Sequence, residues 1–136
     1  MDIYEQLTRD EGRKKFPYED TVGKLTIGVG RNLTDVGLSD AEIDLLLRND
    51  VQKAYSALNS SYPWFQEIDP VRQGVLINMT FNLGFVRFSG FHNFIEAVQE
   101  ENWDKASVDM LDSLWAKQVG GRALRLAEQI RTGRWI

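Results

Sequence analysis

The chain has 136 residues, no cysteine, and 20 acidic against 16 basic side chains, which gives a formal net charge of −4 at pH 7. This length suits one domain, or two small lobes that share a core, and such a chain buries about two thirds of the surface that its unfolded form exposes. The missing cysteine excludes disulfides and thiolate chemistry. The acidic charge argues mildly against a dedicated nucleic-acid binder, and no run of about 18 apolar residues predicts a membrane span.

The first segment predicts a helix from Asp2 to Glu11, because Asp2 opens a capping-box pattern and Gly12 is a natural helix end. Glu11 then lies in the last turn, at the negative end of the helix dipole, where the protonated form of a carboxylate is favoured. A general acid needs that form near neutral pH. From this segment alone, an exposed glutamate at a frayed helix end is the simpler interpretation.

Residues 16–31 predict a β-hairpin. Pro17 cannot donate to a ladder and marks an edge strand, residues 20–23 supply turn chemistry, and residues 24–30 alternate with a period of two. One face of the second strand carries only the small side chains Thr26, Gly28 and Gly30. A ligand can approach the backbone there, although a sharply twisted strand would also use such glycines.

A loop at 32–38 is followed by a helix expected from 39 to 60, which is long for a chain of this size and starts with a capping-box pattern at Ser39 and Glu42. Asp69 and Pro70 mark the start of the next helix, as N-cap and first helical residue. The rest of the chain is apolar and helical. Helical patterns cover 70–83, 94–99, 103–111, 114–118 and 122–131. The fold class expected from these elements is α+β, with a small β-lobe at 13–38, a connecting helix at 39–60, and a helical lobe formed by 1–12 plus 61–136.

The sequence does not support a metal site or a catalytic nucleophile activated by histidine, and no cofactor is expected. His92 is the single histidine, so neither a histidine-based zinc cluster nor a Ser-His-Asp triad can be built. A pair of carboxylates, Glu11 and Asp20, remains beside the glycine-lined strand. Two carboxylates in unequal environments are the minimal equipment of a glycoside hydrolase. With 20 acidic residues in the chain, this spacing alone is a weak signal.

Several short motifs, taken in order, resemble one known family. They are E-G at Glu11, Y-x-D at Tyr18, T-x-G-x-G at Thr26, N-M-x-F at Asn78, W-D at Trp103, S-x-W at Ser113, Q-x-x-x-R at Gln118 and R-T-G-x-W at Arg131. This order is similar to that of the phage-type lysozymes, the endolysins of the T-even bacteriophage kind, and it covers essentially the whole chain. The resemblance implies a lysozyme-like fold with a cleft between its two lobes.

The resemblance also implies muramidase activity, that is, hydrolysis of the β-1,4 bond between N-acetylmuramic acid and N-acetylglucosamine in peptidoglycan. Glu11 takes the family role of general acid, Asp20 that of the second carboxylate, and Thr26 lies beside the attacked carbon and its water. Arg122 matches the family arginine that pairs with the acid, which favours the charged carboxylate and opposes the helix dipole. The implied mechanism is inverting, with Asp20 activating a water.

Substrate contacts carried over from the family fall on Gly30, Asn32, Phe81, Phe94 and Asp109. Phe81 agrees in type, whereas Asn32, Phe94 and Asp109 depart from the T-even residues. Phe94 also suits a core position in an aromatic cluster. Arg31 stands where the family often has histidine, so it keeps a cation there but removes any titration near neutral pH.

The resemblance places a chain without a signal peptide in the host cytoplasm when it is made, and in the wall space when it acts. A holin is then needed for its release, and a monomer that does not insert into membranes is expected. The basic segment 113–136 suits an anionic polymer or a solvated helix face equally well. Two rival functions remain, a wall-binding module that has lost catalysis and a transglycosylase, which Asp20 disfavours. Binding of nucleic acid is not expected.

Overall fold

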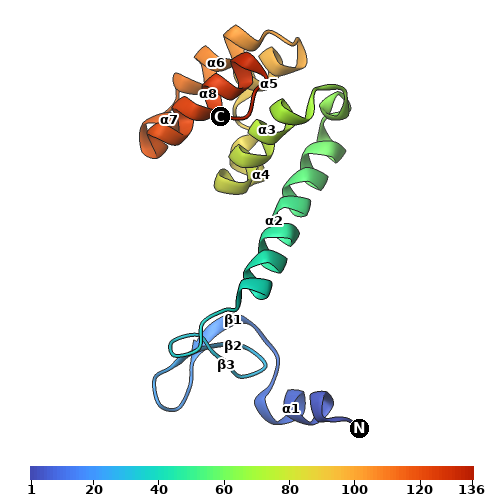
Figure 1. Ribbon diagram of the computed structural model, residues 1–136, viewed down its shortest axis with the longest axis vertical. Coiled ribbons are helices and arrows are strands. Elements are labelled where there is room, and N and C mark those ends of the chain that lie inside the picture. The colour runs from blue at the N-terminus through green and yellow to red at the C-terminus, as the bar shows by residue number, and fades with distance from the viewer. The chain divides into compact units, whose positions relative to one another are not determined.

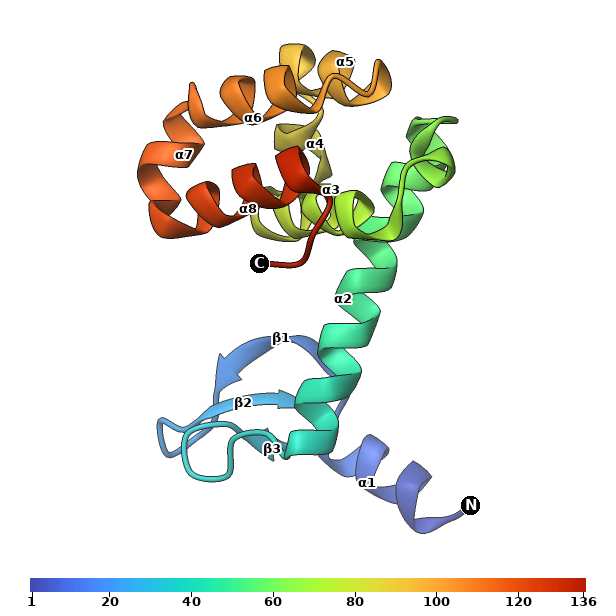
Figure 2. The same cartoon turned by 45° about the horizontal axis from the view of Figure 1, so that its top comes forward.

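The computed structural model describes residues 1–136 and confirms the predicted α+β class, with a small antiparallel sheet near the N-terminus followed by helices (Figures 1 and 2). The chain forms two compact units, Met1–Leu46 and Leu47–Ile136. The first unit contains α1 (Ile3–Glu11), β1 (Lys14–Glu19), β2 (Leu25–Gly28) and β3 (Arg31–Asn32). Helix α2 (Asp40–Ser61) begins in the first unit and continues into the second. The division of the chain into lobes, including the place of residues 1–12, stays a prediction.

Helix α1 begins and ends as the sequence predicts. The Asp2 side chain accepts the backbone N–H of Glu5 at 2.8 Å, and the Glu5 carboxylate accepts the backbone N–H of Asp2 at 3.2 Å. This reciprocal capping box satisfies two donors that the helix cannot bond internally. Gly12 closes the helix at φ +80° and donates its N–H to the carbonyl of Thr8. Glu11 is therefore the last residue of a well-capped helix.

The sheet has the order β1-β2-β3, and both pairings are antiparallel. Thr26 in the central strand pairs with Tyr18 on one side and with Asn32 on the other. A bulge interrupts β1 between Lys14 and Tyr18, in the stretch where Pro17 has no N–H to donate. The strand expected at 24–30 is shorter than predicted, because it ends at Gly28, and the third strand was not predicted.

The start of α2 is fixed by a second predicted capping box. Ser39 donates its backbone N–H to the Glu42 carboxylate at 2.9 Å, and Glu42 donates its own to the Ser39 hydroxyl at 3.2 Å. Arg31 adds two further hydrogen bonds, because its Nη1 donates to Glu42 Oε1 at 2.6 Å and to the carbonyl of Gly37 at 3.2 Å. One guanidinium thereby holds β3, the following loop and the first turn of α2 together.

The second unit is helical. Its elements are η1 (Phe65–Glu67), α3 (Pro70–Leu83), α4 (Phe85–Phe88), α5 (His92–Gln99), α6 (Trp103–Leu111), α7 (Leu114–Val119) and α8 (Gly121–Thr132). Helix α8 packs against α3, α6 and α7, and α5 packs against α6. Their shared core includes Leu58, Phe65, Met79, Phe88, Phe94, Met110 and Ile130. The sequence missed the short η1 and α4, which are single turns within apolar stretches.

Arg72 ties α3 to the end of α8. Its Nε donates to the carbonyl of Ile130 at 2.7 Å and its Nη2 to that of Arg131 at 3.1 Å, so it satisfies carbonyls at the C-terminal end of that helix. The guanidinium also lies 4.2 Å from the centre of the Trp103 ring. No helix of the protein combines the length and the apolar character that crossing a membrane requires.

We predict that the Arg31–Glu42 pair makes the stability of the protein depend on pH in the acidic range. The hydrogen bond from Arg31, then those from Ser39, lower the pKa of Glu42 from its usual 4.5 to about 2. Because the folded pKa lies below the unfolded one, the stabilisation is complete above pH 4.5 and is lost as the pH falls toward about 2. Glu42→Gln should therefore lower Tm at about pH 7, and the difference from wild type should shrink below pH 4.5.

Thermal unfolding followed by circular dichroism from neutral pH down to about pH 2 measures this difference. Asp44→Asn is the matched control, because Asp44 lies on the same helix and is exposed without a hydrogen bond or ion pair. A difference between Glu42→Gln and wild type that stays constant with pH would contradict the prediction.

Candidate active site

The Glu11 carboxylate lies directly against the backbone of Gly30. A Cβ added to Gly30 would lie 2.8 Å from Glu11 Oε2, closer than real Cβ contacts allow, and 3.0 Å from Glu11 Cδ. Gly30 also has φ +66°, a conformation that residues with a side chain rarely adopt. The structure thus brings together two of the predicted site residues, and only glycine lets the Glu11 carboxylate occupy this place.

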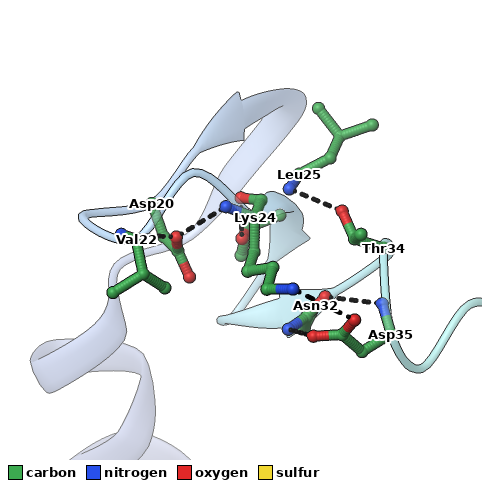
Figure 3. Close-up of polar contacts among 8 residues, drawn as sticks. Asp20, Val22, Lys24, Leu25, Asn32, Thr34 and Asp35 are labelled. Atoms are coloured by element: carbon green, nitrogen blue, oxygen red, sulfur yellow. Dashed lines mark hydrogen bonds and ion pairs between the residues drawn. The ribbon is translucent and has the colours of Figure 1, made fainter.

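Asp20 follows β1 directly and builds the hairpin turn with one of its carboxylate oxygens. Its Oδ1 accepts the backbone N–H groups of Val22 at 2.9 Å and Lys24 at 2.8 Å (Figure 3). The Asp20 backbone N–H donates to the Lys24 carbonyl at 2.9 Å and closes the turn further. Oδ2 makes no hydrogen bond within the protein. The carboxylate therefore has a fixed orientation and one free oxygen.

Thr26 is the one buried side chain of the sheet, with 4% of its surface exposed. Its hydroxyl donates to the carbonyl of Lys24 at 3.0 Å. A threonine hydroxyl has a single hydrogen to donate and two lone pairs to accept with. Because that hydrogen is used within the strand, the hydroxyl is left as an acceptor.

Asn32 pairs with Thr26 in the ladder, and its side chain bonds to the loop that follows it. Asn32 Nδ2 donates to Asp35 Oδ2 at 3.0 Å, and the Asp35 backbone N–H donates to Asn32 Oδ1 at 2.9 Å (Figure 3). Asp35 Oδ1 in turn lies 3.3 Å from Lys24 Nζ. The sequence analysis missed Lys24 and Asp35, although the Asn-x-x-Asp spacing after a strand is a recognisable turn signal.

Phe81 and Arg122 lie in the second unit and line one apolar depression of about 410 Å³, together with Leu47, Val51, Gly74, Ile77, Asn78 and Trp135. Phe81 is 46% exposed, so its ring is available to a ligand. Arg122 donates through Nε to Asn78 Oδ1 at 2.9 Å, which fixes its guanidinium on α3. The pairing of Arg122 with Glu11 stays a prediction.

Phe94 and Asp109, two further predicted contacts, line one depression of about 350 Å³ with His92, Asp112 and Ser113. Phe94 is only 1% exposed and packs edge-on against Phe88, so it serves the core, as the alternative interpretation of the aromatic cluster expects. Asp109 Oδ2 pairs with Lys105 Nζ at 2.6 Å, and this hydrogen bond raises the pKa of Lys105. A sugar contact at either residue stays a prediction.

The small antiparallel sheet and the helical body are the α+β architecture of lysozyme-like proteins. The family model for phage lysozymes matches residues 8–131 of the chain. Two relatives from Dictyostelium discoideum, "Probable T4-type lysozyme 1" and "Probable T4-type lysozyme 2", are each 25% identical over 160 aligned positions, which cover 96% of this chain and 94% of each relative. The "Pre-baseplate central spike protein Gp5" of Enterobacteria phage T4 is 29% identical over 98% of this chain, which spans 28% of that protein.

The chain therefore belongs to the phage lysozyme family. Membership makes it a glycoside hydrolase, with peptidoglycan as the substrate class. The resemblance found in the sequence is confirmed at this level.

We predict that Gly30 and Gly28 respond differently to alanine. Both have positive φ, +66° and +70°, so each alanine variant should lose about 1–2 kcal/mol of stability through backbone strain. Only a Cβ at Gly30 meets the Glu11 carboxylate, because nothing lies within 4 Å of a Cβ at Gly28. Gly30→Ala should therefore also lose peptidoglycan hydrolysis, by about tenfold or more if displacement of Glu11 by an ångström misplaces a reacting group.

Chemical denaturation gives the two stabilities, and release of reducing ends from purified peptidoglycan gives the two activities. The Gly28→Ala variant controls for strain alone. Equal loss of activity in both variants would show that the contact between Glu11 and Gly30 has no separate effect.

Proposed function

We propose that this lysozyme is an inverting muramidase in which Glu11 is the general acid and Asp20 activates the attacking water. The bond cleaved is the β-1,4 link between N-acetylmuramic acid and N-acetylglucosamine. The observation that carries this proposal is the bonding of Asp20, which has one oxygen anchored by Val22 and Lys24 and one oxygen free. A general base needs a fixed direction and an unoccupied acceptor, and this carboxylate has both.

In this proposal, Thr26 also binds the attacking water, as a hydrogen-bond acceptor. Its hydroxyl hydrogen is bonded to the Lys24 carbonyl, so its lone pairs are left to accept from a water. Asp20 Oδ2 then takes the proton as the water attacks the anomeric carbon, and Glu11 gives its proton to the leaving oxygen. Arg122, held by Asn78, is proposed as the partner of Glu11.

Saccharide contacts are proposed at Gly30, Asn32, Phe81 and Asp109. Phe81 offers an exposed ring face for stacking on a sugar, and Asn32 lies beside Thr26 in the sheet. Phe94 is buried, so we propose that it acts indirectly, by supporting from the core the depression that it lines. We further propose that the protein acts as a monomer in host cell lysis, made in the host cytoplasm and released to the wall by a holin.

We predict that Glu11→Gln and Asp20→Asn each reduce hydrolysis by at least about a hundredfold, since each removes a proton-transfer group. The assay is clearing of a peptidoglycan suspension, and circular dichroism checks that each variant is folded. Glu19→Gln is the matched control, because it neutralises the exposed carboxylate next to Asp20 and should keep wild-type activity. Full activity of Glu11→Gln would remove Glu11 from the proposed role.

Product analysis decides between the mechanisms. Proton NMR taken during the first turnovers should show the α-anomer at the new reducing end if the reaction inverts, and the β-anomer if it retains. A product with 1,6-anhydro ends, detected by mass spectrometry, would identify a transglycosylase. Binding of peptidoglycan by the wild-type protein without any cleavage would identify a binding module.

A further inference from the structure

Asp35 engages both ends of the Asn32 side-chain amide. It accepts from Asn32 Nδ2 through its carboxylate, and it donates its backbone N–H to Asn32 Oδ1 (Figure 3). An amide side chain can turn over by exchanging its oxygen and nitrogen, and its orientation is set by its partners. An ionised carboxylate only accepts and a backbone N–H only donates, so this pair of bonds permits one orientation of the Asn32 amide.

The fixed orientation leaves one N–H of Asn32 Nδ2 without a partner. An amide nitrogen carries two hydrogens, and Asp35 takes one of them. Asn32 lies beside Thr26 in the antiparallel ladder, so this remaining donor belongs to the strand next to the proposed water site. The group that it suits is an acceptor oxygen, such as a sugar hydroxyl or an acetamido carbonyl.

The loop that carries Asp35 is tied to the hairpin at two points. Lys24 pairs through Nζ with the second oxygen of Asp35, while its backbone N–H is bonded to Asp20. The Thr34 hydroxyl accepts the backbone N–H of Leu25 at 2.9 Å (Figure 3). An exposed ion pair contributes little by itself, but these bonds together connect the Asp20 turn with the Asn32 loop.

We propose that Asp35 is a positioning residue for saccharide recognition, which holds the Asn32 amide so that its free N–H donates to an acceptor oxygen of the glycan. This inference rests on the proposed function, in which Asn32 contacts the substrate. It assigns a role to Asp35, and it makes Asn32 a donor and not an acceptor toward the sugar. Asp35 itself does not touch the reacting atoms.

An exchange of the two side chains separates recognition from loop stability. In Asn32→Asp, two carboxylates face each other, so the loop is weakened and the donor is lost. In the double variant Asn32→Asp with Asp35→Asn, the amide introduced at position 35 donates to the carboxylate introduced at position 32. That variant restores the bond across the loop, yet position 32 still lacks an N–H for the sugar.

Two measurements test the proposal on the full chain. The first is Tm by circular dichroism. The second is kcat and KM for hydrolysis of soluble, uncross-linked peptidoglycan strands, with the dissociation constant for the same strands measured by calorimetry in a Glu11→Gln background. Asn32→Asp should lower Tm and raise KM about threefold to tenfold, the range expected for one lost hydrogen bond, with little change in kcat. The double variant should recover Tm and keep the raised KM.

Recovery of both Tm and KM in the double variant would overturn the proposal, because the Asn32–Asp35 pair would then serve the loop alone. An unchanged KM in Asn32→Asp would overturn it as well. If the protein binds the strands but does not cleave them, the proposed chemistry fails while the dissociation constants still test this inference. If the protein does not bind the strands at all, both proposals fail.

Discussion

The hairpin turn at Asp20 is the constraint on which the first unit depends, since a single carboxylate oxygen accepts the backbone N–H groups of Val22 and Lys24. This turn sets the register that places Thr26 opposite Tyr18, and the same central strand then pairs Thr26 with Asn32. A one-residue slip would move every side chain of the strand to the other face. The residue proposed as the base therefore also determines where its neighbours in the site lie. Its structural role uses only Oδ1, so folding and chemistry do not compete for the same atom.

Polar contacts carry much of the organisation of the first unit, because Thr26 is the only residue buried there. Two charged pairs connect the hairpin region to the segments that follow it: Lys24 in the hairpin turn pairs with Asp35 in the loop after β3, and Arg31 in β3 pairs with Glu42 in α2. The Arg31 pair is reinforced by the capping box of α2, since Glu42 accepts from Ser39 as well. The second unit is organised in the opposite way, around a continuous apolar core with Arg72 closing the end of α8. The residues proposed to bind the glycan are thus held by directional bonds on the first unit, while on the second unit a proposed contact such as Phe81 lies on a packed helical scaffold.

Local signals in the sequence were sufficient for the longer helices, but not for the single-turn helices η1 and α4 or for the hydrogen bonds of the site. Capping patterns at Asp2, Ser39 and Asp69 fixed three helix starts because each depends on residues only three positions apart. The third strand was missed because two residues, Arg31 and Asn32, are too few to show an alternation. The contact of Glu11 with Gly30 joins segments far apart in the chain, and no periodic pattern of side chains in the sequence indicates such a contact. The histidine-to-arginine departure at position 31 was visible in the sequence, but its partner Glu42 was found only from the structure.

The hydrogen bonds and ion pairs of each carboxylate show whether one of its oxygens is free for proton transfer. Both oxygens of Asp35 are engaged, one by Lys24 and one by Asn32, so it has no free oxygen with which to take a proton from a water. Glu42 keeps Oε2 free, but Arg31 and Ser39 both bond to its Oε1, and the bond from Arg31 lowers its pKa, which makes it a poor proton acceptor. Asp20 keeps one oxygen free, and Glu11 makes no hydrogen bond while it lies against Gly30. Twenty acidic residues made the carboxylate pair a weak signal in the sequence, and hydrogen bonding to both oxygens excludes Asp35, Asp69 and Glu128 from that number. An acid with a fixed direction and an unoccupied oxygen is equipped for proton transfer, whereas an acid with both oxygens bonded is equipped to position its neighbours.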